Sequence, residues 1–181
     1  MATADLSTIT RTVRRQYEDL PYPQRNPEDE KTRLCQTSLD ELSALNHYCY
    51  HGKKNFRKGF RALVAGGGTG DSLIYLGHQL SVTDAELVYL DLSEASMEIA
   101  RRRARCRGFE HKVTWLHGSL LDLPQMGLDP FDYINYSACC IISPIRHRGW
   151  QRSNRSSKTT ARSKLCSTDN TAGLVFLKCR S

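Results

Sequence analysis

A glycine-rich segment between two apolar runs constrains the fold most strongly. The first run, Arg-Ala-Leu-Val-Ala at residues 61–65, leads directly into the glycines of residues 66–70, and a helix-like stretch follows. The second run, residues 86–90, is closed by Asp91, twenty-one positions after Gly70. In a nucleotide-binding strand–helix–strand unit, a glycine turn meets the ligand and the acidic residue binds ribose hydroxyls. The spacing therefore predicts a parallel unit that binds an adenosine cofactor.

Short runs rich in Val, Leu and Ile continue to alternate with helical segments along the chain. This pattern predicts an α/β fold whose parallel sheet is covered on both faces. Strands are expected at residues 61–65, 86–90, 112–116 and 131–137, with helices at 71–80 and 93–108, the second capped by Ser93. Before the first strand, we expect a short helix at 9–17 and a second at 38–51, which Ser38 and Glu41 would cap. The expected organisation is an N-terminal arm and helix at 1–59, a cofactor domain at 60–138 and a basic tail at 139–181.

Charge is distributed unevenly along the 181 residues. The net charge is +7, yet residues 1–142 contain 17 Lys and Arg against 18 Asp and Glu. Residues 143–181 contain 9 Lys and Arg and one acidic residue, Asp169. A nucleic-acid-binding domain is typically basic over its own surface. The distribution therefore indicates a neutral domain with a basic tail, and it disfavours a nucleic-acid partner.

Cysteine usage and hydropathy indicate a reduced compartment away from the membrane. The seven cysteines form no Cys-x-x-Cys pair, and no histidine pair has zinc spacing, so we expect no metal site. An odd number of cysteines without a signal-like segment is typical of cytosolic thiols. No apolar run approaches the length of a membrane span. These features predict a cytoplasmic protein without a membrane partner.

Each element of the glycine segment has a physical task. Gly66 and Gly68 allow a tight turn and a close approach to a ligand, while Gly70 begins a helix whose N-terminus faces it. Asp91 would accept hydrogen bonds from both ribose hydroxyls. Ligands of open α/β sheets bind at the carboxyl ends of the strands. The candidate site therefore lies where the first and second strands end.

The glycine spacing here is G-x-G-x-G rather than the G-x-G-x-x-G of most NAD-binding loops. This spacing and three later motifs resemble the class I S-adenosylmethionine-dependent methyltransferases over residues 61–137. Asp91-Leu92-Ser93 resembles the acidic loop of that family, residues 117–123 resemble its third motif, and residues 131–137 its fourth-strand motif. The resemblance implies a Rossmann-like sheet of order 3-2-1-4 and S-adenosyl-L-methionine as the cofactor. The cofactor-binding residues that it implies are Gly66, Gly67, Gly68, Gly70, Asp91, Leu92, Ser119, Leu120 and Asn135.

The resemblance also implies methyl transfer to an unidentified acceptor, either a small molecule or a protein. The methyl carbon of this cofactor is already electrophilic, so the enzyme must chiefly align the acceptor in line with the breaking bond, and no catalytic residue is assigned. The Asn-Pro-Pro-Tyr motif of nucleic-acid amino methylation is absent, because residues 135–138 read Asn-Tyr-Ser-Ala. Two alternatives remain open: an NAD(P)-binding oxidoreductase, and a truncated, non-catalytic chain whose basic tail binds nucleic acid or acidic partners.

The chain departs from the family pattern after Ala138. A class I sheet has seven strands, but residues 139–181 contain only one strand-like stretch, at 173–177. The expected sheet is therefore incomplete, with the fourth strand at its edge and an irregular tail. A shifted reading frame would restore family-like residues after Ala138, so our hypothesis is a truncation or frame shift at this point.

Two further clusters have an expected structural role. The arginines of residues 101–107 are interpreted as the solvated face of a helix. The aromatic residues His47, Tyr48 and Tyr50 are assigned to core packing rather than to the cofactor site.

Overall fold

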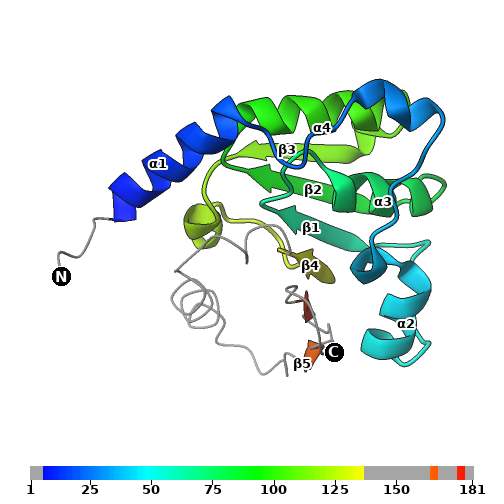
Figure 1. The fold of residues 1–181 in the computed structure, drawn as a ribbon. Coiled ribbons are helices and arrows are strands. Elements are labelled where there is room, and N and C mark those ends of the chain that lie inside the picture. Colours follow the sequence, from blue (N-terminus) through cyan, green and yellow to red (C-terminus); the bar gives the residue numbers. More distant parts are fainter. Residues whose placement is uncertain (1–5, 137–163, 167–174, 178–181) are drawn as a thin grey trace.

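The computed structural model describes residues 6–136, 164–166 and 175–177. A sheet of order β3-β2-β1-β4-β6-β5 forms its centre (Figure 1). The strands are β1 (Arg61–Ala65), β2 (Glu86–Asp91), β3 (Val113–His117), β4 (Tyr133–Asn135), β5 (Lys164–Cys166) and β6 (Val175–Leu177). The pairs β3–β2, β2–β1 and β1–β4 are parallel. The expected order 3-2-1-4 is therefore confirmed.

The expectation that the sheet stops at its fourth strand is wrong. β6 pairs antiparallel with β4, placing Phe176 opposite Ile134, and β5 pairs antiparallel with β6. β4 is therefore an inner strand whose second side is also hydrogen-bonded. β6 falls within the stretch 173–177 that the sequence marks as strand-like, whereas β5 was not anticipated. The rest of the expected basic tail, the proposed frame-shift point and the end of the predicted fourth strand lie outside the described residues.

The helices are α1 (Leu6–Asp19), α2 (Leu42–Tyr50), α3 (Asp71–Gln79) and α4 (Glu94–Cys106), with short 3-10 turns between them. Ser93 caps α4 as expected, since its hydroxyl accepts a hydrogen bond from the amide of Ser96. The expected cap of the helix at 38–51 is wrong, because residues 38–40 form a separate 3-10 turn, η2. The side chain of Glu41 caps α2 instead, accepting from the amide of Ser43. Ser38 and Glu41 are both polar residues that could cap a helix, and the later one is the N-cap of the α-helix.

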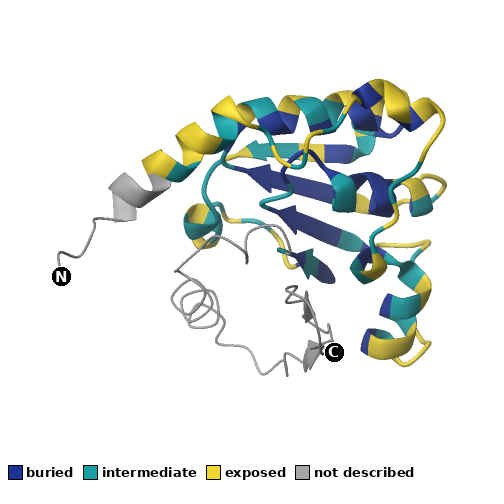
Figure 2. Cartoon of the chain, viewed as in Figure 1, coloured by how far each residue is buried: buried dark blue, intermediate teal, exposed yellow. Residues whose placement is uncertain are grey.

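The two faces of the sheet are covered differently. Alternate residues of β1 and β2, among them Val64 and Tyr89, face a large apolar cluster that includes residues of α2, α3 and α4. The intervening residues, among them Leu63 and Leu90, face a smaller cluster formed with the 3-10 turn η4 (Leu120–Gln125) and its neighbours. β1 and β2 are accordingly buried along almost their whole length (Figure 2). Within the described residues, the helical cover predicted for both faces is present on one.

The parallel strands place their carboxyl ends at one edge of the sheet. α1 and η4 lie beside this edge, whereas α2 lies at the opposite, amino-terminal end (Figure 1). After α1, residues 20–31 return across the glycine loop towards α4. None of the described helices has the length and apolar character that crossing a bilayer requires. The carboxyl edge is thus bordered by the N-terminal helix and by the turn that follows β3.

Candidate functional site

Asp91 lies at the carboxyl end of β2 and is held by backbone amides. Its Oδ2 accepts from the amide of Gly68 at 2.8 Å, and its Oδ1 accepts from the amide of Ser93 at 2.8 Å. Burial raises the pKa of the carboxyl above its ordinary value, against the opposing effect of these amides. The carboxylate therefore fastens the glycine loop to the start of α4.

The glycine loop, residues 66–70, has a left-handed backbone at three positions. Gly66, Gly68 and Gly70 have φ values of 65°, 55° and 97°. A Cβ atom on Gly68 would lie 2.4 Å from the carbonyl oxygen of Tyr22, and one on Gly70 would lie 2.8 Å from the Cβ of Ala100. The absence of side chains at these two positions thus serves contacts with the N-terminal arm and with α4. The sequence had predicted that Gly68 was needed for approach to a ligand.

Gly67 is required by packing inside the sheet layer. A Cβ on this residue would lie 2.3 Å from the ring of Tyr89. The hydroxyl of Tyr89 in turn donates to the carbonyl oxygen of Gly68. The glycine loop is therefore held by two residues of β2: it packs on Tyr89, and it donates to the carboxylate of Asp91.

The turn after β3 reaches the same edge of the sheet. The amide of Gly118 donates to the carbonyl oxygen of Asp91 at 2.9 Å, which fixes the chain just before Ser119. Ser119 begins η4, and its hydroxyl accepts from the amide of Leu121. Leu120 packs against the smaller apolar cluster, and the carbonyl oxygen of Leu92 lies 3.0 Å from Nε2 of His117. Leu92, Ser119 and Leu120 thus border Asp91.

Asn135 ends β4 beside Val64 of β1, but its side chain is directed into a buried polar cluster. Its Nδ2 donates to Asp40 Oδ1 at 2.6 Å and lies 3.2 Å from the hydroxyl of Ser72. Asp40 also accepts from the hydroxyls of Thr37 and Tyr133. Sequence reasoning missed Asp40, since nothing in its neighbourhood marks a buried aspartate.

The N-terminal arm contacts both halves of the carboxyl edge. The carbonyl oxygens of Tyr22 and Pro23 accept from the amide and the hydroxyl of Thr69, respectively. At the other half, the carboxylate of Glu18 accepts from the amides of Glu94 and Ala95 at 2.7 and 3.0 Å. These backbone contacts have no sequence signature, and they bring the arm directly onto the candidate site.

The arginine-rich stretch of α4 is only partly a solvated face. Arg103 is 1% exposed, and its guanidinium bonds to Glu30 of the arm, to Asp71 and to the carbonyl oxygen of Thr69. Arg107 also reaches Glu30. The interpretation of all five arginines as solvated is therefore wrong for Arg103, because the arm supplies an acidic partner that lies far away in the sequence.

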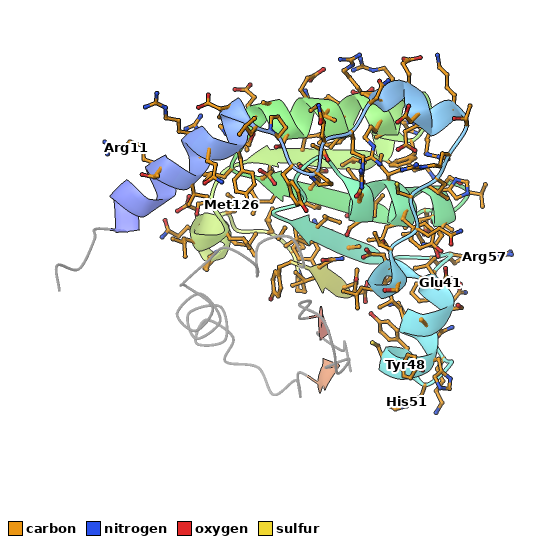
Figure 3. The ribbon with its side chains drawn as sticks, viewed as in Figure 1. Arg11, Glu41, Tyr48, His51, Arg57 and Met126 are labelled. Carbon is orange, nitrogen blue, oxygen red and sulfur yellow. The ribbon has the colours of Figure 1, made fainter. Side chains whose placement is uncertain are left out.

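The aromatic residues of α2 lie away from the carboxyl edge. Tyr48 is 65% exposed and, with His51, lies at the opposite end of the sheet from Arg11 and Met126 (Figure 3). The expected core packing is thus wrong for His47 and Tyr48, which are both exposed, whereas the Tyr50 side chain packs against the larger apolar cluster. Within residues 6–136 and the two short strands that follow, no three His, Cys, Asp or Glu side chains gather to hold a metal ion.

Comparison with solved structures supports this fold. An O-methyltransferase from Bacillus cereus in complex with SAH is 16% identical; the match covers 93% of this chain and 97% of that one, with a TM-score of 0.51. A variant of MtNAS is 15% identical, with coverages of 98% and 78% and a TM-score of 0.52. A geranyl diphosphate methyltransferase in complex with GPP and sinefungin is 25% identical, but the TM-score is 0.35. The match covers 46% of this chain and only 29% of that methyltransferase.

The family comparison covers the strands and loops that build the carboxyl edge. No match was found among curated proteins. A family model described as a methyltransferase domain matches residues 62–158, which is more than half of the 181 residues. This match begins in β1 and includes the glycine loop, Asp91 and β4. The chain therefore belongs to the methyltransferase domain family.

Proposed function

We propose that this chain binds S-adenosyl-L-methionine at the carboxyl ends of β1 and β2 and transfers its methyl group to an acceptor. The observation that carries the proposal is the carboxylate of Asp91, fixed between the glycine loop and the start of α4. Membership of the methyltransferase domain family supports the same reading. The Bacillus cereus O-methyltransferase of similar fold was solved with SAH, the product form of this cofactor.

The residues at this edge fit the adenosine part of the cofactor. Each oxygen of Asp91 accepts one backbone amide. The backbone of Leu92 gives a further hydrogen bond to this carboxylate. A carboxylate has about four acceptor positions, so acceptor capacity is left for the ribose hydroxyls. Leu92, Ser119 and Leu120 adjoin Asp91 and would border the adenine.

The methionine part would lie over the glycine loop. Gly66, Gly67, Gly68 and Gly70 would lie beside this part at the start of α3, where the positive end of the helix dipole favours a carboxylate. The amides of Gly66, Gly68 and Gly70 already donate within the protein, so these three glycines would shape the site rather than donate to the ligand. Asn135, at the end of β4, would support this part of the site through the polar cluster that it forms with Asp40. Its amide nitrogen already donates within that cluster, so Asn135 would support the site rather than donate to the ligand.

The sulfonium supplies an electrophilic methyl group, and the protein's task is alignment. Asp91 and the glycine loop would fix the cofactor, while the segments bordering the edge exclude water and orient the acceptor nucleophile in line. No side chain is assigned as a general base. The acceptor is proposed to be a small molecule or a protein substrate.

The test is calorimetric titration of the purified chain with S-adenosylhomocysteine. We expect binding to the wild type and roughly 100-fold weaker binding to Asp91→Ala, because two hydrogen bonds to a charged acceptor contribute about 3 kcal/mol. Glu86→Ala is the matched control, since it removes a carboxylate from the exposed, opposite end of the same strand.

Three outcomes would contradict the proposal. A folded wild-type chain that does not bind S-adenosylhomocysteine would lack the cofactor site. Competition by NADH at comparable concentrations would instead favour a dinucleotide-binding oxidoreductase. Equal binding to Asp91→Ala and Glu86→Ala would show that the ligand lies elsewhere on the molecule.

A further inference from the structure

Residues 17–31, which comprise the end of α1 and the segment after it and which we call the strap, are tied to the glycine loop by charged side chains. Arg103 provides the first tie from α4. Its Nε donates to Glu30 Oε1 at 2.8 Å, and its Nη1 donates to the carbonyl oxygen of Thr69 and to Asp71 Oδ1, both at 2.8 Å. One buried guanidinium therefore joins the strap, the glycine loop and the first residue of α3.

Arg25 provides the second tie from the strap itself. Its Nε and Nη2 donate to the two oxygens of Asp71 at 2.9 and 2.6 Å, a bidentate arrangement. Partial burial alone would raise the pKa of Asp71, but the hydrogen bonds and charges of Arg25 and Arg103 lower it. Asp71 is thus held ionised between two arginines from different segments.

The strap also contacts the backbone at both halves of the site. The carbonyl oxygen of Tyr22 fills the position that a side chain at Gly68 would occupy, and Pro23 accepts from Thr69. At its start, the carbonyl oxygen of Tyr17 accepts from the hydroxyl of Ser93, two residues after Asp91. The same loops that would hold the cofactor therefore also hold the strap.

Shared contacts of this kind couple two binding events. If the docked strap fixes the glycine loop in its binding conformation, the cofactor binds without the cost of ordering that loop. Reciprocity then requires the bound cofactor to stabilise the docked strap by the same factor. An undocked strap would release Thr69, Asp71 and Arg103 together.

We propose that Arg25 and Arg103 are positioning residues: through Asp71 and Thr69 they make docking of the strap a condition for full cofactor affinity. This inference rests on the proposed function, because it concerns the same cofactor site. Neither arginine is assigned a contact with the methyl acceptor or with the reacting atoms.

The test compares Arg25→Ala with the wild type by calorimetry with S-adenosylhomocysteine. Arg25 is partly exposed and lies outside the apolar core, so the variant should fold. We expect binding about tenfold weaker, a typical size for coupling between sites. Arg25→Lys, which keeps the charge but not the bidentate geometry, should restore part of the affinity.

Arg33→Ala is the matched control. It removes the same charge at an exposed position just beyond the strap, where the guanidinium donates to Cys35 Sγ rather than to Asp71. We expect its affinity to equal that of the wild type. Hydrogen exchange gives the second readout: S-adenosylhomocysteine should slow exchange across residues 17–31 in the wild type and much less in Arg25→Ala.

The outcomes separate this inference from the proposed function. A wild type that does not bind S-adenosylhomocysteine contradicts the function itself. A wild type and an Arg25→Ala variant that bind equally would retain the function and overturn the coupling. Equal weakening by Arg25→Ala and Arg33→Ala would reduce the effect to net charge and would also overturn it.

Discussion

Two buried aspartates near the parallel strands differ in what holds them. Asp91 accepts from two backbone amides in the loops that end β1 and β2. Asp40 is fully buried and accepts from three side chains, those of Thr37, Tyr133 and Asn135, at 2.6 to 2.8 Å. Asp40 thus joins the turn before α2 to β4, on the face of the sheet that the helices cover.

This difference separates the carboxylate that we propose to bind the cofactor from one that holds distant segments of the fold together. The backbone amides around Asp91 use only part of its acceptor capacity, so the carboxylate could bind a ligand as well as the loop. The donors around Asp40 come from segments far apart in the sequence, and they use the carboxylate to hold the fold. Burial raises the pKa of both groups, so a shifted pKa by itself does not identify the functional one.

The largest expected effect concerns stability. Asp40→Ala would leave the hydroxyl of Tyr133 and the amide of Asn135 buried without their acceptor, which should lower the free energy of unfolding by about 3 kcal/mol or more. Asp91→Ala, which loses two amide contacts at the edge, should lower it by about 1 to 2 kcal/mol. Urea unfolding of both variants measures the difference.

The same two variants should rank in the opposite order for the ligand. S-adenosylhomocysteine should still raise the melting temperature of Asp40→Ala but should hardly raise that of Asp91→Ala. Equal losses of stability together with equal responses to the ligand would remove the distinction between the two aspartates.

A second prediction concerns how tightly the Asp91 edge is packed. Gly70→Ala adds a left-handed strain and a Cβ that would lie 2.8 Å from that of Ala100, and it should cost about 2 to 3 kcal/mol. Gly108→Ala is the control, because its φ is 78° and no atom lies within 4 Å of the added Cβ. It should cost about 1 kcal/mol from strain alone. If urea unfolding shows similar losses of stability for the two variants, α4 moves to accommodate the added methyl group and the edge is not tightly packed.

The smallest expected effect is the pH dependence of stability. The lowered pKa of Asp71 contributes stability above the unfolded value of about 3.9, and this contribution is lost as the pH falls through the folded pKa. The raised pKa values of Asp40 and Asp91 act with the opposite sign, because the folded state takes up their protons first. Asp71→Asn should therefore reduce the acid destabilisation below about pH 4 by about 1 kcal/mol.

Unfolding measured from pH 6 to pH 3 in the wild type and in Asp71→Asn tests this sign. An unchanged acid limb in the variant would show that the two arginines do not stabilise the ionised form of Asp71. Arg15, an exposed residue of α1 paired with Asp19, offers the control: Arg15→Ala should leave the acid limb as it is.

The local elements were predictable because their signals lie close together in the sequence. β1 has the predicted bounds, Ser93 caps α4 as predicted, and the order of the four parallel strands is confirmed. The apolar runs, the glycines and the N-cap each act within a few residues. The separate turn at residues 38–40 was missed because Ser38 and Glu41 are both acceptable caps.

The contacts of the arm were not predictable, because they join distant segments. Arg103 looks like one of five solvated arginines until Glu30, 73 positions earlier, is placed beside it. The contact between Gly68 and the carbonyl oxygen of Tyr22, 46 positions earlier, has no local sequence signal either. In both cases, a segment distant in the sequence folds against the residue and buries it.

The sequence by itself determined the parallel strand–helix–strand unit, the glycine turn and the position of Asp91 at the end of β2. Periodicity, turn chemistry and capping act within a few residues, so they predict these elements without knowledge of the rest of the fold. Only the tertiary structure decided that the N-terminal strap lies on the glycine loop, that Arg103 is buried and that Asp40 fastens β4. These outcomes depend on burial and on partners from distant segments, because a charged group is stable inside the protein only where the fold brings opposite charges or donors to it.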